Sequence, residues 1–243
     1  MPRPNLIVYL IISPYSIVPY HNENLLDIAD PDTNHFGENI VDFSSYTTDD
    51  LTKLDLSGEG NLNIMHHNCR SIRTEGKLDK YQVILSALNN QFHILGFTET
   101  WLKEGNCNEV NFDDFEHIYC LRTVDAFFDM EQRGGGLSLF IKNNLNFKVR
   151  YDLNRMLPFI ETLFIELQYN NKSYVIGVVY RVPNTNVELY INEINSIIEP
   201  IRNEHDVIIM GDFNICLLQN DKHSRSFRNC MQCNSLYPTI TMM

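Results

Sequence analysis

Two polar residues stand two positions apart in the tetrapeptide Gly211-Asp212-Phe213-Asn214, directly after an apolar run over residues 207–210. In extended backbone, residues two apart point to the same side, so Asp212 and Asn214 are predicted to face one pocket. A carboxylate can orient or deprotonate water, and an amide can hold a phosphate oxygen. The pair therefore suits cleavage of a phosphodiester, but four residues carry little information alone, and other segments must supply the rest of a site.

Two further predicted strands end in a polar residue. Glu99 follows the buried run 92–97, and Asn68 follows the run 62–67. A carboxylate at the end of a buried strand can bind a hard cation, since Mg²⁺ takes one or two protein carboxylates together with water and substrate phosphate. The Asn68 amide could orient a metal-bound water or reach the metal. The structural alternatives are a helix-start glutamate and a turn-forming asparagine.

Tyr180 and Arg181 end another predicted strand, just before Val182 and Pro183. The tyrosine hydroxyl could donate to a phosphate, and the guanidinium could contact it through two N–H groups. A core aromatic followed by a surface arginine is the alternative. The glycine run 134–136 is not a phosphate loop, because it lacks the Lys-Ser/Thr of a Walker motif and leads into a strand, so we expect a bulge or sharp bend there.

Strands and two helices would position these residues. We expect strands at 62–66, 92–97, 115–121, 136–141, 147–151, 161–169, 173–179 and 206–211, and helices at 77–90 and 187–201. Asn170-Asn171-Lys172 suits a hairpin turn, and Pro200 should bend or end the second helix. Helices interspersed with hairpins indicate an α/β fold of two packed sheets with helices outside, over one domain from residue 61 to 243.

The acidic residues are concentrated at the N-terminal end. The net charge is −12, and residues 1–60 hold ten acidic and two basic side chains, so we expect an acidic, disordered extension there. Its apolar run, residues 6–12, is too short to span a bilayer and is interpreted as an unstructured leader, with no membrane partner. The acidity argues against tight, charge-driven binding to duplex DNA. It does not exclude a site that binds phosphate through a metal ion.

The six cysteines are scattered and form no compact disulfide framework, which favours a reducing intracellular setting, cytoplasmic or nuclear. Cys230 and Cys233 have CxxC spacing, but no second such pair follows to complete a zinc site. We interpret them as packing residues.

In this order, the motifs resemble the endonuclease/exonuclease/phosphatase superfamily, and more narrowly the endonuclease domain of LINE-type non-LTR retrotransposons of the jockey or CR1 kind. The resemblance covers roughly residues 61–243. The matching segments are Asn68-Cys69-Arg70-Ser71-Ile72 with Lys77, Thr98-Glu99-Thr100-Trp101-Leu102, Arg133-Gly134-Gly135-Gly136, Tyr180-Arg181-Val182-Pro183 and Gly211-Asp212-Phe213-Asn214.

The resemblance implies a two-sheet α/β sandwich like that of DNase I, and nicking of DNA with Mg²⁺, or Mn²⁺ in its place. A reverse transcriptase, expected elsewhere in a full-length element, would then prime from the nick. By position, Glu99 binds the metal with help from Asn68. Tyr180 and Asn214 hold and polarise the phosphate, and Asp212 orients or deprotonates the attacking water.

The resemblance also implies three substrate contacts: Arg70, Arg181 and Thr239. One departure stands out. The family carries a late Ser-Asp-His segment, whereas the only histidine after Asn214 is His223, in a different setting. We therefore expect a C-terminally truncated domain that is weak or inactive, with residues 213–218 and the tail partly unpacked. Two other hypotheses stay open: a phosphatase or apurinic-site nuclease of the same superfamily, and a non-catalytic remnant or binding module.

Overall fold

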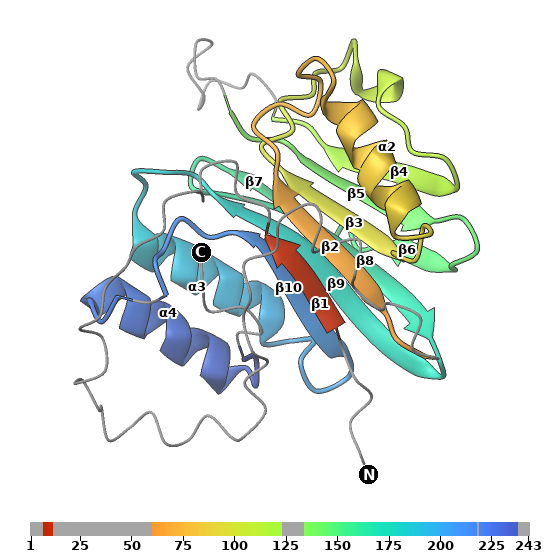
Figure 1. Cartoon of the computed structure of the whole chain (residues 1–243). Coiled ribbons are helices and arrows are strands. Elements are labelled where there is room, and N and C mark those ends of the chain that lie inside the picture. Colours follow the sequence, from red (N-terminus) through yellow and green to blue (C-terminus); the bar gives the residue numbers. More distant parts are fainter. Residues whose placement is uncertain (1–6, 12–59, 123–133, 218, 238–243) are drawn as a thin grey trace, which may run out of the picture.

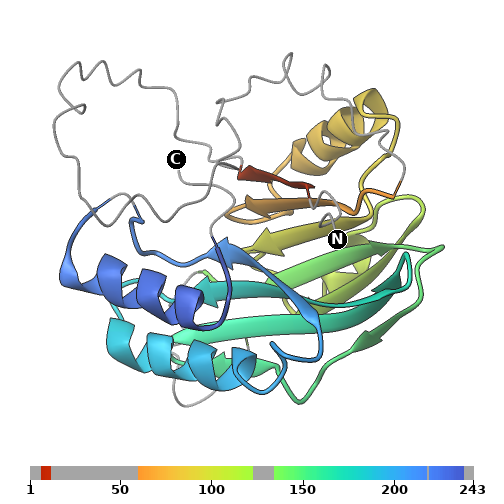
Figure 2. The same cartoon turned by 90° about the horizontal axis from the view of Figure 1, so that it is seen from below.

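Two five-stranded sheets pack face to face, with helices on both outer sides (Figures 1 and 2). This is a computed structural model, and it describes residues 7–11, 60–122, 134–217 and 219–237. The first sheet has the strand order β1-β2-β3-β5-β4. Its strands are β1 (Ile7–Ile11), β2 (Asn63–Asn68), β3 (Ile94–Thr98), β4 (Phe115–Cys120) and β5 (Leu137–Lys142).

The second sheet has the order β10-β9-β8-β6, and β7 also pairs with β8. Its strands are β6 (Phe147–Val149), β7 (Arg155–Leu157), β8 (Ile160–Tyr169), β9 (Lys172–Arg181) and β10 (Asp206–Asp212). β8 and β9 form the expected hairpin, and positive φ angles at Asn170 (50°) and Asn171 (61°) match a two-residue turn of type I′.

Two pairs of parallel strands determine where the strand ends that carry polar residues come together. Helix α2 (Lys77–Ala87) connects β2 to β3, and helix α3 (Val187–Ile198) connects β9 to β10. In parallel strands joined by a crossover helix, the carboxyl ends lie at the same edge. Asn68 therefore lies beside Thr98 in the first sheet, and Asp212 beside Tyr180 in the second.

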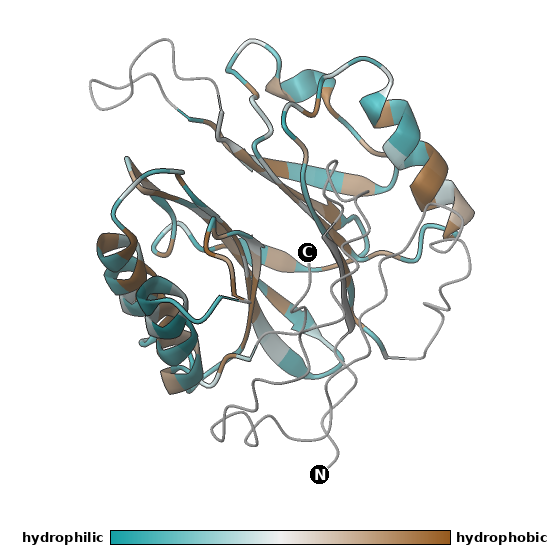
Figure 3. Ribbon diagram, turned by 60° about the vertical axis from the view of Figure 1, so that its left-hand side comes forward, coloured by the Kyte–Doolittle hydropathy of each residue, from teal (hydrophilic) through white to brown (hydrophobic). Residues whose placement is uncertain are grey.

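The core consists of three apolar layers. The middle layer, between the sheets, includes Ile64, Leu139, Ile176 and Met210. A second layer lies under α2, and a third lies under α3 and helix α4 (Lys222–Cys233). Figure 3 shows hydrophobic residues concentrated on the strands and hydrophilic residues along the outer sides of the helices.

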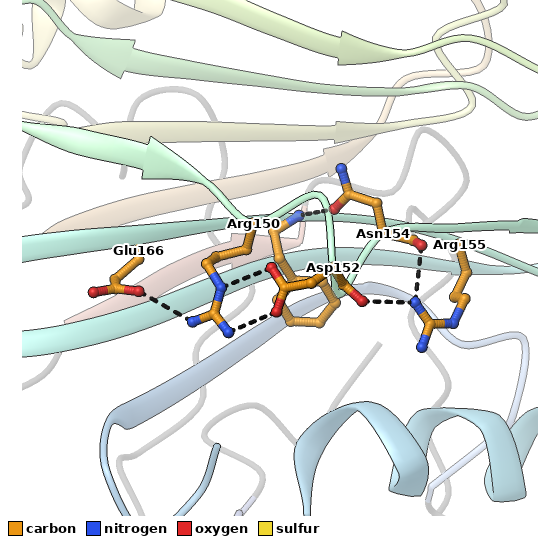
Figure 4. A network of polar contacts seen from close by, with 6 residues as sticks. Arg150, Asp152, Asn154, Arg155 and Glu166 are labelled. Atoms are coloured by element: carbon orange, nitrogen blue, oxygen red, sulfur yellow. Dashed lines mark hydrogen bonds and ion pairs between the residues drawn. The ribbon is translucent and has the colours of Figure 1, made fainter. Parts of the chain in front are cut away.

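A polar network holds the β6–β7 connection against β8 (Figure 4). The Arg150 guanidinium donates to both carboxylate oxygens of Asp152, at 2.9 and 2.8 Å, and to Glu166 Oε2 at 3.0 Å. Asn154 Oδ1 accepts the backbone N–H of Phe164 at 2.9 Å. These bonds give the connection a fixed path, which helps to explain why the short strand β7 forms where no strand was expected.

Helix α4 differs from the expectation of a loosely packed tail. Asp221 caps it by accepting the N–H groups of His223 and Ser224, at 2.7 and 2.9 Å. Phe227 is 2% exposed and packs in the layer shared with α3. Cys230 lies in the same contact region, as expected for a packing cysteine, whereas Cys233 is exposed and does not pack there.

Strand β1 also differs from expectation. Residues 7–11 pair in parallel with β2 and add a strand to the edge of the first sheet, where an unstructured leader was predicted. The rest of the acidic extension, residues 1–6 and 12–59, lies outside the described residues. Of the helices that the structure describes, none is long and apolar enough to cross a bilayer.

Candidate active site

The carboxyl ends of β2, β3, β9 and β10 bring four of the predicted site residues together. The Asn68 amide nitrogen donates to Glu99 Oε1 at 2.9 Å and to Asp212 Oδ2 at 2.6 Å. Glu99 directly follows β3 of the first sheet, and Asp212 ends β10 of the second. One amide thus joins two carboxylates across the interface between the sheets, which places both on one partly exposed surface.

Tyr180 lies between the two carboxylates and the interior. Its ring is buried, and its hydroxyl donates to Glu99 Oε1 at 3.4 Å. Burial raises the pKa of the Tyr180 phenol, and the negative charge of Glu99 raises it further. The hydroxyl therefore stays protonated at neutral pH and can donate a hydrogen bond to an anion.

Asn214 is exposed beside Asp212 and is tied to the protein on two sides. Its backbone N–H donates to Asp212 Oδ1 at 3.0 Å, and its amide nitrogen donates to the backbone oxygen of Arg181 at 2.7 Å. It has a φ of 48°, a conformation that asparagine adopts more readily than most residues. Both oxygens of Asp212 thus have a fixed hydrogen-bond donor.

Arg181 has a different role from the predicted one. It is 6% exposed, and its guanidinium donates to the backbone oxygens of Phe213 (2.8 Å), Asn214 (2.6 Å) and Thr185 (3.0 Å). Because its donors are directed at these carbonyls from behind the loop, we correct the expected phosphate contact to a structural one. Arg181 holds the loop that carries Asn214.

The loop after β2 carries Arg70, which is exposed as a substrate contact would need to be. Its backbone N–H donates to Asn68 Oδ1 at 3.3 Å. The Lys77 ammonium donates to the backbone oxygens of Cys69, Arg70 and Ser71, so the lysine of the matching motif secures this loop. Whether the Arg70 side chain contacts substrate stays a prediction. Thr239 lies outside the described residues.

Backbone strain is concentrated around the site. Glu99 and Trp101 have φ angles of 53° and 55°, and Arg70 and Ser71 have 40° and 72°. Non-glycine residues adopt such angles at a cost of about 1–3 kcal/mol each, and they do so mostly where surrounding contacts enforce them. Here the N–H groups of Thr100 and Trp101 donate to the glycine run at 3.1 and 3.0 Å. The three glycines have positive φ angles of 128°, 72° and 82° and lead directly into β5.

Sequence reasoning missed two charged residues beneath the site, Glu161 and Arg122. Glu161 is fully buried on β8, forms an ion pair with Arg122, and accepts the N–H of Gly136 at 2.7 Å through Oε2. Burial raises the pKa of Glu161, against the lowering effects of Arg122 and of the Gly136 N–H. No clear sequence signal singled out Glu161, since β8 also contains Thr162, Glu166 and Gln168.

The donor set suits a hard cation better than a soft one. The described part of the chain contains no group of three or more His, Cys, Asp or Glu side chains that could hold a metal ion. Two carboxylates and an amide nevertheless match what Mg²⁺ takes from proteins. Asn68 presents its nitrogen to Glu99 and Asp212, so its oxygen would reach an ion there only after the amide turns over.

Comparisons with known proteins bear on the family and on the fold. A family model, "Endonuclease/Exonuclease/phosphatase family", matches residues 65–236. AP endonuclease LMAP from Leishmania major aligns with a TM-score of 0.56 and 16% identity, over 80% of this chain and 72% of that one. The endonuclease domain of TRAS1, a telomere-specific non-LTR retrotransposon, aligns with a TM-score of 0.50 and 13% identity, over 70% and 71%. These two likenesses establish the fold alone, and no curated protein matches.

Proposed function

Because the chain belongs to the endonuclease/exonuclease/phosphatase family, as the match over residues 65–236 shows, we propose that it is a metal-dependent endonuclease that nicks DNA. The predicted superfamily and the predicted two-sheet α/β fold are confirmed. The DNA substrate, the Mg²⁺ ion and the origin in a retrotransposon go beyond that match and make up the proposal.

One observation supports it most: the Asn68 amide lies between Glu99 and Asp212, which come from different sheets. Two carboxylates in contact with one nitrogen repel each other, and their repulsion is relieved best by a cation. If Asn68 had only a structural role, its amide would need no second carboxylate as a hydrogen-bond partner. The same surface exposes Asn214, a neutral group that can hold a phosphate oxygen.

Glu99 would hold Mg²⁺, or Mn²⁺ in its place, with Asn68 as a second ligand once its amide has turned over. When bound, the ion neutralises charge on the phosphate and on the leaving oxygen. Charge on the ion also lets an acidic protein bind a polyanion without a large basic surface.

The other site residues would act directly on the phosphate and the water. The Tyr180 hydroxyl and the Asn214 amide donate hydrogen bonds to non-bridging oxygens, which hold the phosphate in place. Asp212, with both oxygens already oriented by Asn68 and Asn214, accepts a proton from the attacking water. The water oxygen forms the new bond to phosphorus as the bond to the sugar oxygen breaks, and the sugar oxygen takes a proton from solvent and leaves as a hydroxyl.

The order of motifs favours the retrotransposon group, and the TRAS1 domain is one of the proteins that share the fold. In such an element, a reverse transcriptase domain would extend the DNA from the nick.

A plasmid assay tests the proposal. Supercoiled DNA is incubated with the chain in MgCl₂, MnCl₂ or EDTA, and open circles are counted over time. We expect nicking with either metal and none with EDTA or with Glu99→Ala. Glu193→Ala, on the outer helix α3, is the control and should nick normally. Equal nicking by Glu99→Ala and wild type would refute the assignment. Parallel arms with abasic duplex and inositol phosphates separate the other activities of the superfamily.

A further inference from the structure

We propose that the buried Arg122–Glu161 ion pair is a positioning unit for this site, which fixes both the ring of Tyr180 and the backbone next to Glu99. The inference rests on the proposed function, since it assigns a role within the same site. It concerns two residues that contact neither the ion nor the phosphate, so they are positioning residues and not catalytic ones.

The pair is buried to a degree that stability alone does not explain. The Glu161 side chain is 0% exposed and the Arg122 side chain 9%. Removing two charges from water costs free energy that their mutual attraction often fails to recover, so a well-packed apolar pair is frequently as stable or more so. A geometric role is the better explanation for charge at this place.

One path leads from the pair to Tyr180. Glu161 and Tyr180 are direct neighbours in the register of β8 and β9. The Arg122 guanidinium carbon lies 5.8 Å from the centre of the Tyr180 ring, within the range of a cation–π contact. The tyrosine hydroxyl then reaches Glu99 at 3.4 Å. The guanidinium therefore supports the ring whose hydroxyl faces the site.

A second path leads from the same carboxylate to Glu99. Glu161 Oε2 accepts the N–H of Gly136, and the oxygen of Gly136 accepts the N–H of Thr100 at 3.1 Å. Thr100 directly follows Glu99, which is held at a φ of 53°. A Cβ atom on Gly136 would lie 2.7 Å from Thr100 Oγ1, so the two segments are in close contact. Moving Glu161 would thus displace both ends of the Tyr180–Glu99 contact.

Two variants separate positioning from folding. Arg122→Lys keeps the positive charge but loses the planar fork that both faces the carboxylate and supports the ring. The double variant Arg122→Met/Glu161→Gln removes both charges together, so no unpaired charge stays buried, and the glutamine oxygen can still accept the Gly136 N–H. The matched control is Arg155→Met/Glu193→Gln, a partly buried ion pair of 2.6 Å between β7 and α3.

Two measurements are made on each variant. In the plasmid assay, we expect kcat to fall roughly 10- to 100-fold in the Arg122 variants with KM for DNA little changed, because a small misplacement of reacting groups costs that much. In ¹⁹F NMR of the 3-fluorotyrosine-labelled protein, we expect the Tyr180 resonance, assigned with Tyr180→Phe, to move in these variants. The exposed Tyr151 serves as the internal reference.

The outcomes keep the two proposals apart. Wild-type kcat in the double variant, or a Tyr180 resonance that stays in place in Arg122→Lys, overturns the positioning role while the nuclease assignment stands. If the wild-type chain nicks no DNA, the proposed function fails, and the NMR comparison alone decides whether the pair positions Tyr180. The inference would also be overturned if the control variant Arg155→Met/Glu193→Gln shifted the Tyr180 resonance as far as the Arg122 variants do.

Discussion

Asn68 and Asp212 lie 144 residues apart in the chain, and the amide nitrogen of Asn68 donates to Asp212 Oδ2 at 2.6 Å. Asn68 ends β2 of the first sheet, and Asp212 ends β10 of the second. Their contact can form only when the two sheets have packed, so the site depends on the whole sandwich and on neither half alone. Glu99 accepts a second hydrogen bond from the same nitrogen.

Asp212→Asn should weaken the stabilisation by Mg²⁺. Glu99 would hold the ion, and the amide removes the negative charge of Asp212 beside that carboxylate, so the site attracts a cation less strongly. In the metal-free protein, the relief of charge repulsion offsets the one hydrogen bond that the amide cannot accept from Asn68 or Asn214. Wild-type protein should gain about 2.7 kcal/mol at a Mg²⁺ concentration 100 times the dissociation constant. Thermal unfolding with and without MgCl₂ measures both effects. Asp206→Asn, at the other end of β10 and exposed, should keep the wild-type shift.

Arg181→Met should destabilise the fold by about 2–3 kcal/mol, because three backbone oxygens would lose a charged donor. Nicking should also fall, since the loop that carries Asn214 would be released. Urea unfolding and the plasmid assay measure the two losses. The surface change Arg225→Met removes a single contact, to the oxygen of Asn220, and should cost far less. Equal stability of the two variants would contradict the structural role of Arg181.

The sequence was sufficient to predict the strand ends and the residues on them. Apolar runs that each finish in a polar residue define Asn68, Glu99, Tyr180 and Asp212, and parallel strands place such ends at one edge. The role of Arg181 could not be predicted in this way. Its burial depends on how the loop after β10 closes over it, and this is a property of tertiary packing.

Other parts of the structure could not be predicted from the sequence, for related reasons. The partnership of Glu161 with Arg122 depends on the approach of Arg122, two residues after β4, to the second sheet, which no local pattern encodes. Helix α4 is polar apart from Phe227, Cys230 and Met231, and so short an apolar stripe does not distinguish a packed helix from a loose tail. The apolar run that forms β1 is short, and a short run of this kind does not distinguish a strand from a leader.

Gly211→Ala should prevent folding or cost several kcal/mol. Gly211 has a φ of 154°, and a Cβ atom there would lie 1.8 Å from the backbone oxygen of Val179, in the strand paired with β10. Backbone cannot yield as a flexible side chain can, so β9 and β10 would have to separate next to Asp212. Gly105→Ala is the control, because a Cβ at Gly105 meets nothing within 4 Å. Soluble yield and thermal unfolding distinguish the two variants.

Acid should weaken the fold through three histidines that are kept neutral inside it. Burial lowers the pKa of His66 to about 3 and the pKa values of His67 and His117 to about 4. The unfolded chain binds protons at these residues below pH ~6.5, where the fold excludes them. The stability is therefore complete above that pH and is lost as the pH falls from ~6.5 towards ~4, by up to about 1.4 kcal/mol per pH unit for each histidine.

His117→Gln tests this pH dependence, because His117 stacks on Phe140 and bonds to Ser138, away from the site residues. The variant should be less stable at neutral pH, since packing against Phe140 is lost, yet its stability should depend less steeply on pH. Urea unfolding at several values between pH ~7.5 and ~5 gives that slope, which should fall by about one proton per molecule. An unchanged slope would mean that His117 binds its proton equally well in the folded and unfolded states, which its partial burial in the first sheet argues against.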